Sequence, residues 1–399
     1  MQYRTMPKNG DTLSTLGFGC MRLPMREGQI DEPRAMAQIR DAIEHGVNYV
    51  DTAWPYHGGM SEPLLGKALR DGYRNRVKLA TKLPSWLIER REDFDRYLTA
   101  QQERLGTDHI DYYLMHSLNG GAWDRLQALG VREWLDEAQR DGRIVNAGFS
   151  YHGLAKDFAR VVDAYPWVFC QIQYNYLDEY NQAGTAGLHY ATEKGLGVIV
   201  MEPLRGGNLG GTPPPAVEAI WREAAQPRTP AEWALRWVWD HPEVTVVLSG
   251  MNEEAHIREN LAIAEVAAPQ SLTADELHLV ERAGATYRAL MKVGCTGCGY
   301  CMPCPAGVMI PNCFEGYNQM HMFGGGETAK FMYALRLSGQ LTHTAPGYAS
   351  QCVACGACVE HCPQQIPIPE LLAQVTAEME DAAMPQRLVA ALQIFKKQA

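Results

Sequence analysis

Cysteine placement constrains this chain more than any other feature of its sequence. Only Cys20 and Cys170, of 11 cysteines, come before residue 290, and the other nine fall between residues 295 and 362. A secreted protein held together by disulfides would spread its cysteines through a short chain and begin with an apolar leader. Residues 1–4 show no such leader. We therefore expect the crowded cysteines to be metal ligands in a cytoplasmic protein.

Two cysteine runs have the spacing of iron–sulfur cluster ligands. In the downstream run, three cysteines stand at every third position, and a fourth, Cys362, follows four positions later and precedes Pro363. This is the spacing of bacterial ferredoxins, in which the fourth cysteine ligates the other cluster of a pair. The upstream run also ends in a Cys-Pro pair, Cys304-Pro305. We therefore expect two 4Fe-4S clusters with crossed ligation, one held by Cys295, Cys298, Cys301 and Cys362, and the other by Cys352, Cys355, Cys358 and Cys304.

The alternative for these cysteines is a pair of zinc sites. A zinc knuckle uses two cysteines separated by two residues and does not need a third at the same step. The third cysteine of each run therefore favours iron–sulfur clusters over zinc. Cys313 belongs to neither run, and we expect it to be a small buried apolar residue, like Cys20 and Cys170.

Upstream of the cysteines, short apolar runs alternate with longer amphipathic stretches. Such an alternation over about 250 residues is typical of a (β/α)8 TIM barrel. A doubly wound open sheet would need a glycine-rich phosphate-binding sequence after its first strand, and Gly17-Phe18-Gly19-Cys20-Met21-Arg22 does not supply one. We expect an α/β barrel in residues 1–285, with a hairpin at Asn9-Gly10 closing its bottom, and a small, mainly α ferredoxin-like domain in residues 286–399. The expected strands are residues 16–20, 47–51, 77–81, 110–116, 144–149, 168–172, 196–201 and 244–248.

Polar residues stand where three of these segments end, the place where TIM-barrel enzymes build their active sites. Asp51, Lys82 and His116 close the second, third and fourth strands, and Tyr56 lies in the loop after Asp51. An ammonium beside a phenol lowers the pKa of the phenol, so Lys82 would make Tyr56 a better proton donor to a carbonyl oxygen. Asp51 would hold Lys82, and His116 would orient the substrate oxygen. Each residue alone could be a structural ion pair or a buried core histidine, but the set at successive strand ends favours catalysis.

A series of short motifs follows the expected strands: Asp51-Thr52-Ala53, Tyr56, Ser61-Glu62, Thr81-Lys82, Leu114-Met115-His116, Gly148-Phe149-Ser150, Gln171-Ile172-Gln173-Tyr174-Asn175, Pro203-Leu204 and Glu259-Asn260. These motifs resemble those of the aldo-keto reductase family, and the cysteine tail is similar to that of its iron–sulfur branch. The resemblance implies a (β/α)8 barrel that transfers a hydride from NAD(H) or NADP(H) to an aldehyde or ketone. It implies that Tyr56 is the general acid, that Lys82 and Asp51 tune it, and that His116 helps to place the carbonyl.

The resemblance also implies which residues contact the nicotinamide cofactor. Two of the positions depart from the family pattern, because Tyr151 stands in place of an asparagine and Met201 in place of an aromatic residue. The implied contacts are Gly19, Met21, Asp51, Ser150, Gln171, Met201, Pro203, Leu204, Gly250, Met251, Glu259 and Asn260.

The segment after the eighth strand departs furthest from the family pattern. Many members carry a Lys-Ser pair and an arginine there, which hold the 2′-phosphate of NADPH. Here the corresponding residues are Gly250, Met251 and His256, and acidic Glu253 and Glu254 lie beside them. We therefore expect NADH to bind at least as well as NADPH.

Composition argues against two classes of partner. The formal net charge is −10 and no basic patch stands out, so we expect no nucleic acid. No run of about 18 apolar residues occurs, so we expect no membrane-spanning segment.

The sequence therefore predicts an oxidoreductase that acts on a small carbonyl or alcohol substrate and is fused to a two-cluster electron-transfer domain. A soluble electron carrier would be its second partner. The alternative is an iron–sulfur electron-transfer or docking protein whose barrel no longer turns over a carbonyl substrate. A third reading is that the clusters only brace the tail, as structural metals do in small domains.

Overall fold

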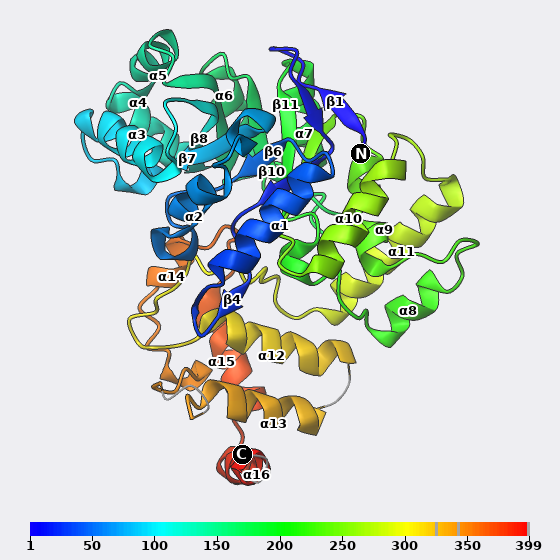
Figure 1. Ribbon diagram of the computed structural model, residues 1–399. Helices are drawn as coiled ribbons and strands as arrows, with labels where there is room; N and C mark the ends of the chain where they lie inside the picture. Colours follow the sequence, from blue (N-terminus) through cyan, green and yellow to red (C-terminus); the bar gives the residue numbers. More distant parts are fainter. Residues whose placement is uncertain (324–325, 341–343, 397–399) are drawn as a thin grey trace. The chain divides into compact units, whose positions relative to one another are not determined.

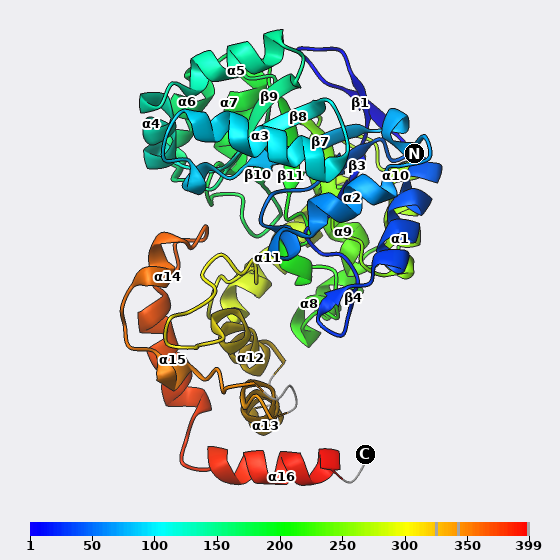
Figure 2. The same cartoon turned by 60° about the vertical axis from the view of Figure 1, so that its left-hand side comes forward.

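The chain forms two compact units in a computed structural model that describes residues 1–323, 326–340 and 344–396. The barrel unit comprises Met1–Arg205 and Arg228–Leu277, and the C-terminal unit comprises Gly206–Pro227 and His278–Ala399 (Figure 1 and Figure 2). A boundary at residue 285 alone would leave Gly206–Pro227 with the barrel, whereas its contacts group it with the C-terminal unit. Within the described ranges, no helix is both long and apolar enough to cross a membrane.

A closed barrel of parallel strands forms the centre of the barrel unit (Figure 1). The strands follow one another around the barrel in chain order, and pairing of the last strand with the first, for example Val247 with Leu16, closes it. Helices alternate with the strands, so the expected (β/α)8 fold is confirmed. The barrel strands are β3 (Leu16–Gly19), β6 (Tyr49–Asp51), β7 (Lys78–Leu83), β8 (Ile110–Leu118), β9 (Ile144–Tyr151), β10 (Phe169–Gln173), β11 (Gly197–Met201) and β12 (Val244–Ser249).

Some of the connecting helices begin at side chains that satisfy free backbone donors. Asp31 accepts a hydrogen bond from the backbone N–H of Arg34 at the start of α1, and the Thr229 hydroxyl accepts one from Glu232 at the start of α9. Such caps pair N–H groups that have no partner within the helix. The helices of this unit are α1 (Glu32–Glu44), α2 (Ser61–Ala68), α3 (Glu92–Leu105), α4 (Gly120–Ala128), α5 (Val131–Arg140), α6 (Ala155–Asp163), α7 (Gly184–Glu193), α9 (Pro230–Trp239) and α10 (Glu254–Val266).

An N-terminal hairpin contributes to the barrel core. Its strands are β1 (Tyr3–Thr5) and β2 (Thr12–Ser14), and Met6 and Leu13 pack in one cluster with interior residues of the barrel strands. A Cβ at Gly197 would lie only 1.8 Å from Sδ of Met6, so the hairpin requires a glycine at the start of β11. The expected hairpin is therefore present. The interior residues are Tyr49, Ala80, Tyr112, Leu114, Phe169, Ile199, Val246 and Leu248.

A separate apolar core holds the C-terminal unit together. Helix α12 (Ile310–Phe323) packs against α13 (Gly326–Leu337) and α15 (Ile368–Met379), and α16 (Met384–Lys396) packs across α13 (Figure 1 and Figure 2). The core includes Phe314, Tyr317, Tyr333, Leu372 and Val375, and six of the expected ligand cysteines pack partly buried against it: Cys295, Cys301, Cys304, Cys352, Cys358 and Cys362. Short helix α14 (Ala357–Glu360) and helices α8 (Pro215–Trp221) and α11 (Ala274–Leu290) complete the helices of this region.

Candidate active site and iron–sulfur centre

The four strand-end residues lie at the carboxyl-terminal mouth of the barrel. Asp51 is the last residue of β6, Lys82 lies near the end of β7, and His116 lies near the end of β8. These strands are neighbours, since β7 pairs with both β6 and β8. Tyr56 opens the 3-10 helix η1 (Tyr56–Gly59), which follows β6.

Lys82 is the hub of this group. Its Nζ donates to Oδ1 of Asp51 at 2.5 Å, to the carbonyl of Thr52 at 2.8 Å and to the phenol oxygen of Tyr56 at 3.3 Å. Nε2 of Gln171 on β10 donates to Oδ2 of Asp51 at 3.1 Å. Both carboxylate oxygens of Asp51 are therefore engaged, and the structure joins three of the predicted catalytic residues directly.

Burial dominates the protonation of these groups. It raises the pKa of Asp51 and lowers the pKa of Lys82, while the attraction between the two charges opposes both shifts. Burial, followed by the charge of Asp51, holds the pKa of Tyr56 well above its usual value. The expectation that Lys82 lowers the pKa of Tyr56 is therefore wrong for the site as it stands, because desolvation and the Asp51 charge outweigh the ammonium.

His116 completes the group as a neutral imidazole. Burial, and then the charge of Lys82, hold the pKa of His116 well below its usual value. Its ring lies edge-on to that of Tyr56, with centroids 6.0 Å apart, and 5.2 Å from the ring of Trp86. Trp86 lies in the loop after β7 and is 43% exposed, so His116 lies between the phenol and a solvent-facing aromatic ring.

A buried hydrogen-bond network connects Gln101 of α3 to the backbone of Lys82. Nε2 of Gln101 donates to the carbonyl of Lys82 at 3.0 Å and to Oε1 of Glu62 at 2.6 Å. Glu62 is fully buried and also accepts from Thr81 at 2.7 Å and from Arg104 at 3.1 Å. Glu62 belongs to a motif that the sequence singled out, whereas Gln101 and Arg104 carried no signal, because a helical glutamine and arginine are ordinary surface residues until their partners are known.

The residues expected to contact a nicotinamide cofactor lie at the same end of the barrel. Gly19 ends β3, Met201 ends β11, and Gly250 and Met251 follow β12, which pairs with β3. Met21 follows β3, Pro203 and Leu204 follow β11, and Ser150 is the penultimate residue of β9.

Several of these side chains already have partners in the protein. The Ser150 hydroxyl accepts from the backbone N–H of Ser117 at 2.8 Å, and Nδ2 of Asn260 donates to the hydroxyl of Ser249 at 2.9 Å. Glu259 accepts from the Thr229 hydroxyl at 2.5 Å. These contacts order the polar groups at the mouth before any ligand binds.

The segment expected to face a 2′-phosphate is acidic and tied to α1. Arg34 contacts Glu253 at 2.5 Å and Glu254 at 2.6 Å, and Nε2 of Gln38 donates to Glu254 at 3.0 Å. Hydrogen bonds from Arg34 come first among the causes that lower the pKa of Glu254 to about 2. The start of α10 therefore presents two acidic side chains that share one arginine.

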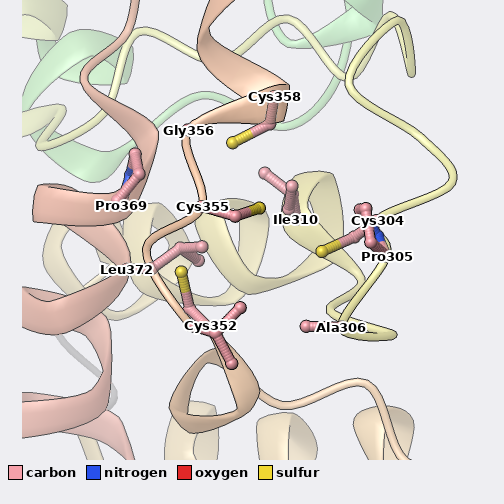
Figure 3. Close-up of a pocket in the computed structure, with 11 residues that line it drawn as sticks. Cys304, Pro305, Ala306, Ile310, Cys352, Cys355, Gly356, Cys358, Pro369 and Leu372 are labelled. Atoms are coloured by element: carbon pink, nitrogen blue, oxygen red, sulfur yellow. The ribbon is translucent and has the colours of Figure 1, made fainter.

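In the C-terminal unit, one hollow collects cysteines from both runs. Cys304 lines it together with Cys352, Cys355 and Cys358, and Ile310 and Leu372 form its apolar wall (Figure 3). The pKa of Cys358 is raised by burial and by Cys352, Cys304 and Cys355, which places the same four thiols near one another. Thiolates in this arrangement are the ligands that a 4Fe-4S cluster takes.

The remaining four cysteines form a second group. Burial raises the pKa of Cys301 to about 12, with further contributions from Cys298, Cys295 and Cys362. Cys362 therefore lies with the upstream run although it belongs to the downstream one. In the part of the chain that the structure describes, no three histidine, cysteine or acidic side chains converge to hold a single metal ion.

The cysteines outside the two runs are buried, as expected. Cys20, Cys170 and Cys313 are each fully shielded from solvent. Burial holds the pKa of all three thiols above the usual value. They are therefore apolar packing residues with little thiolate character.

Comparison with known proteins defines the class of this chain. Residues 15–281 match the aldo/keto reductase family, and residues 294–366 match the 4Fe-4S dicluster domain. The chain belongs to the aldo/keto reductase family and carries a C-terminal 4Fe-4S dicluster domain.

Individual relatives share the barrel at modest identity. The chain is 28% identical to L-galactose dehydrogenase of Arabidopsis thaliana over 306 residues, which cover 70% of this chain and 93% of the relative. It is 22% identical to a probable voltage-gated potassium channel subunit beta of the same plant, covering 67% of this chain and 92% of the relative. An aldo-keto reductase of Bacillus halodurans, in its holo form, superimposes with a TM-score of 0.59 at 25% identity, covering 71% of this chain and 96% of that structure.

Proposed function

We propose that the barrel unit reduces an aldehyde or ketone with a nicotinamide cofactor, and that Tyr56 protonates the carbonyl oxygen. The observation that carries this proposal is the hydrogen-bonded group of Asp51, Lys82 and Tyr56 at the mouth of the barrel. Family membership supports an oxidoreductase. When bound, the nicotinamide supplies the hydride.

The raised pKa of Tyr56 keeps its phenol protonated at neutral pH, which is the form that can donate. As negative charge develops on the phenol oxygen, the ammonium of Lys82, 3.3 Å away, stabilises that charge. Asp51 holds Lys82 in position, so the stabilising charge needs no rearrangement during the reaction. Neutral His116 beside Tyr56 hydrogen-bonds the carbonyl oxygen and orients it.

The residues at the mouth fit a nicotinamide. Ser150 near the end of β9, Gln171 on β10 and Asn260 on α10 are buried, and their hydroxyl and amide groups suit a carboxamide. The acidic pair Glu253 and Glu254 suits ribose hydroxyls and repels a phosphate. NADH should therefore bind at least as tightly as NADPH, with the twelve positions named above as the proposed contacts.

The C-terminal unit would hold two 4Fe-4S clusters with the crossed ligand sets predicted from the sequence. The grouping of Cys304 with Cys352, Cys355 and Cys358 supports this ligation. A nicotinamide transfers two electrons as a hydride, whereas each cluster exchanges one, so carbonyl reduction proceeds without cluster turnover. The clusters then serve a soluble electron carrier or brace the unit. Anaerobic stopped-flow at the visible band of the clusters tests this, since bleaching and recovery at the turnover rate would contradict it.

The same proposal assigns residues 1–285 to the reductase domain and residues 286–399 to the iron–sulfur domain. A cytoplasmic location is part of the proposal, because a reducing compartment favours cysteines that remain available to bind clusters.

A second candidate is an electron-transfer or docking protein whose barrel does not turn over. The departures at Tyr151, Met201 and Gly250 favour it, and one relative carries the name of a channel subunit rather than an enzyme.

Titration of NADH fluorescence with the anaerobically purified protein separates the two candidates. The reductase should quench or enhance the fluorescence saturably and should then oxidise NADH when aldehydes and ketones are added. A protein that neither binds NADH or NADPH nor oxidises them with any carbonyl would contradict the proposed function and favour the second candidate.

A further inference from the structure

The backbone immediately after Tyr56 is held in an unusual conformation. His57, Gly58 and Gly59 have φ values of 53°, 63° and 90°. Glycine adopts this left-handed region readily, but a histidine there is uncommon. Residues in such conformations persist where surrounding contacts fix them, and they concentrate at functional sites. His57 directly follows the proposed proton donor, Tyr56, in the chain.

The imidazole of His57 contacts a different loop. The backbone N–H of Leu23 donates to Nε2 of His57 at 3.1 Å. The Leu23 bond fixes the tautomer, because an acceptor Nε2 places the ring proton on Nδ1. Burial lowers the pKa of His57, which favours this neutral form. The side chain of His57 is therefore hydrogen-bonded to the segment that follows β3.

That segment is also held at its start. The backbone N–H of Cys20 donates to the carbonyl of Asp51 at 2.8 Å, and the Ser61 hydroxyl donates to the carbonyl of Cys20 at 3.0 Å. Beyond Cys20, the bond of His57 to Leu23 joins this segment to the loop of Tyr56. The two loops carry different parts of the proposed reaction, since one bears the proton donor and the other bears Met21, a proposed cofactor contact.

Carbonyl reduction requires a hydride donor and a proton donor at a fixed separation. A misplacement of about 1 Å can cost about a hundredfold in rate. We propose that His57 is a positioning residue that sets the distance between the cofactor loop at residues 20–24 and the phenol of Tyr56. This inference rests on the proposed function, and it adds a residue that touches neither substrate nor cofactor.

Four variants test the role of His57. His57→Ala and His57→Gly both remove the ring, and glycine also relieves the left-handed backbone, so agreement between them assigns the effect to the side chain. His57→Gln keeps an acceptor for the Leu23 N–H. His45→Gln is the matched control, because His45 is exposed at the end of α1 and its ring contacts Asp41 of the same helix, at the carbonyl and the carboxylate.

Amide hydrogen exchange and kcat are measured together. If His57 had only a structural role, the two would not change in parallel. Amide hydrogen exchange should become faster in residues 20–24 of His57→Ala and His57→Gly, and should stay near wild type in His57→Gln and His45→Gln. In the same proteins, kcat with NADH should fall about tenfold to a hundredfold for the Ala and Gly variants, with KM for the carbonyl little changed. The deuterium isotope effect with NADH deuterated at the transferred position should rise, and His57→Gln should recover most of the turnover.

The outcomes are distinguishable. Faster exchange without a loss of kcat would show that the contact exists but positions nothing, and would overturn the inference. Unchanged exchange in His57→Ala would overturn it as well. A wild-type protein without nicotinamide-dependent turnover would instead overturn the proposed function, and the role of His57 with it, whatever the exchange data show.

Discussion

Nζ of Lys82 lies 2.5 Å from Oδ1 of Asp51, and both side chains are almost completely buried. An ion pair in such a place is expensive to form, because both charges lose their hydration. We expect such a pair to be kept where one of its charges has a further role. Here the ammonium of Lys82 also donates a hydrogen bond to the phenol of Tyr56. The pair therefore links the stability of the barrel to its proposed chemistry.

Asp51→Asn should destabilise the barrel strongly, because it leaves the Lys82 ammonium buried without a carboxylate. Breaking a buried pair in this way costs about 3–5 kcal/mol in the free energy of unfolding. Asp71→Asn is the control, because Asp71 pairs with Arg40 at the surface, is 74% exposed and should contribute less than about 1 kcal/mol. Anaerobic urea denaturation followed by circular dichroism measures both.

The double variant Asp51→Asn with Lys82→Met should recover part of the lost stability, since it leaves no unpaired charge. If Asp51→Asn shifted the midpoint no more than Asp71→Asn, the pair would not be a buried ion pair in solution.

His152 should make the protein less stable as the pH falls. Burial lowers its pKa to about 4, whereas an unfolded histidine has a pKa of about 6.5. Below pH 6.5 the unfolded chain binds a proton that the folded protein does not bind, so the contribution is present above pH 6.5 and is lost as the pH falls toward 4. The ring retains some exposure, so we expect the free energy of unfolding to fall by about 1 kcal/mol between pH 7.5 and 5.5.

His152→Gln should flatten this part of the pH dependence, since a glutamine does not titrate. Urea midpoints at pH 7.5, 6.5 and 5.5 measure this pH dependence. If stability changed with pH equally in His152→Gln and in the wild type, His152 would not be its source.

Crossed ligation predicts a specific pattern of iron loss. The wild type should hold about eight irons and eight labile sulfides, and any single ligand variant should lose about four irons. Cys295→Ser with Cys362→Ser should lose no more iron than either single variant, because both cysteines serve one cluster. Cys352→Ser with Cys362→Ser should lose nearly all the iron, because these cysteines serve different clusters.

Cys313→Ser is the control for these variants, since Cys313 is buried outside both groups and should leave the iron content unchanged. The reverse pattern in the two double variants would show that each run holds its own cluster. Zinc in place of iron, without labile sulfide, would show that the cysteines bind zinc and not iron–sulfur clusters.

Much of this organisation could be predicted from the sequence, where local pattern decides the outcome. The crossed cysteine groups follow from the spacing of two runs and their Cys-Pro ends. The placement of Asp51, Lys82 and His116 follows from the rule that parallel strands end at one mouth. Both inferences rest on general rules of motif and fold, which do not require the particular contacts of this chain to be known.

The remainder depends on burial and on long-range contacts. The direction of the pKa shift of Tyr56 was wrong in the sequence analysis because it is set by desolvation, which charge pairing alone does not reveal. The bonds from His57 to Leu23 and from Gln101 to Glu62 join residues of different loops and helices. The grouping of Gly206–Pro227 with the C-terminal unit also depends on contacts that the strand and helix pattern does not specify.

The acidic start of α10 should set the choice of nicotinamide. The wild type should bind NADH at least as tightly as NADPH, because Glu253 and Glu254 repel a 2′-phosphate and occupy Arg34. Replacing both glutamates by glutamine should raise the affinity for NADPH about five- to tenfold relative to the affinity for NADH. Each surface charge contributes about 1 kcal/mol or less. Glu103→Gln on the exposed face of α3 is the control, and fluorescence titration measures all the affinities. Much tighter binding of NADPH by the wild type would contradict this account.

The most direct test of the central claim is the turnover of Tyr56→Phe, assayed anaerobically with NADH and a carbonyl substrate that the wild type reduces. The substitution removes only the phenol oxygen, so the affinity for NADH should stay within about twofold of the wild type, while kcat should fall about a hundred- to ten-thousandfold, the usual contribution of general acid catalysis. Near-normal turnover in this variant would show that the proton comes from another group, and that the site of Asp51, Lys82 and Tyr56 does not carry out the reaction.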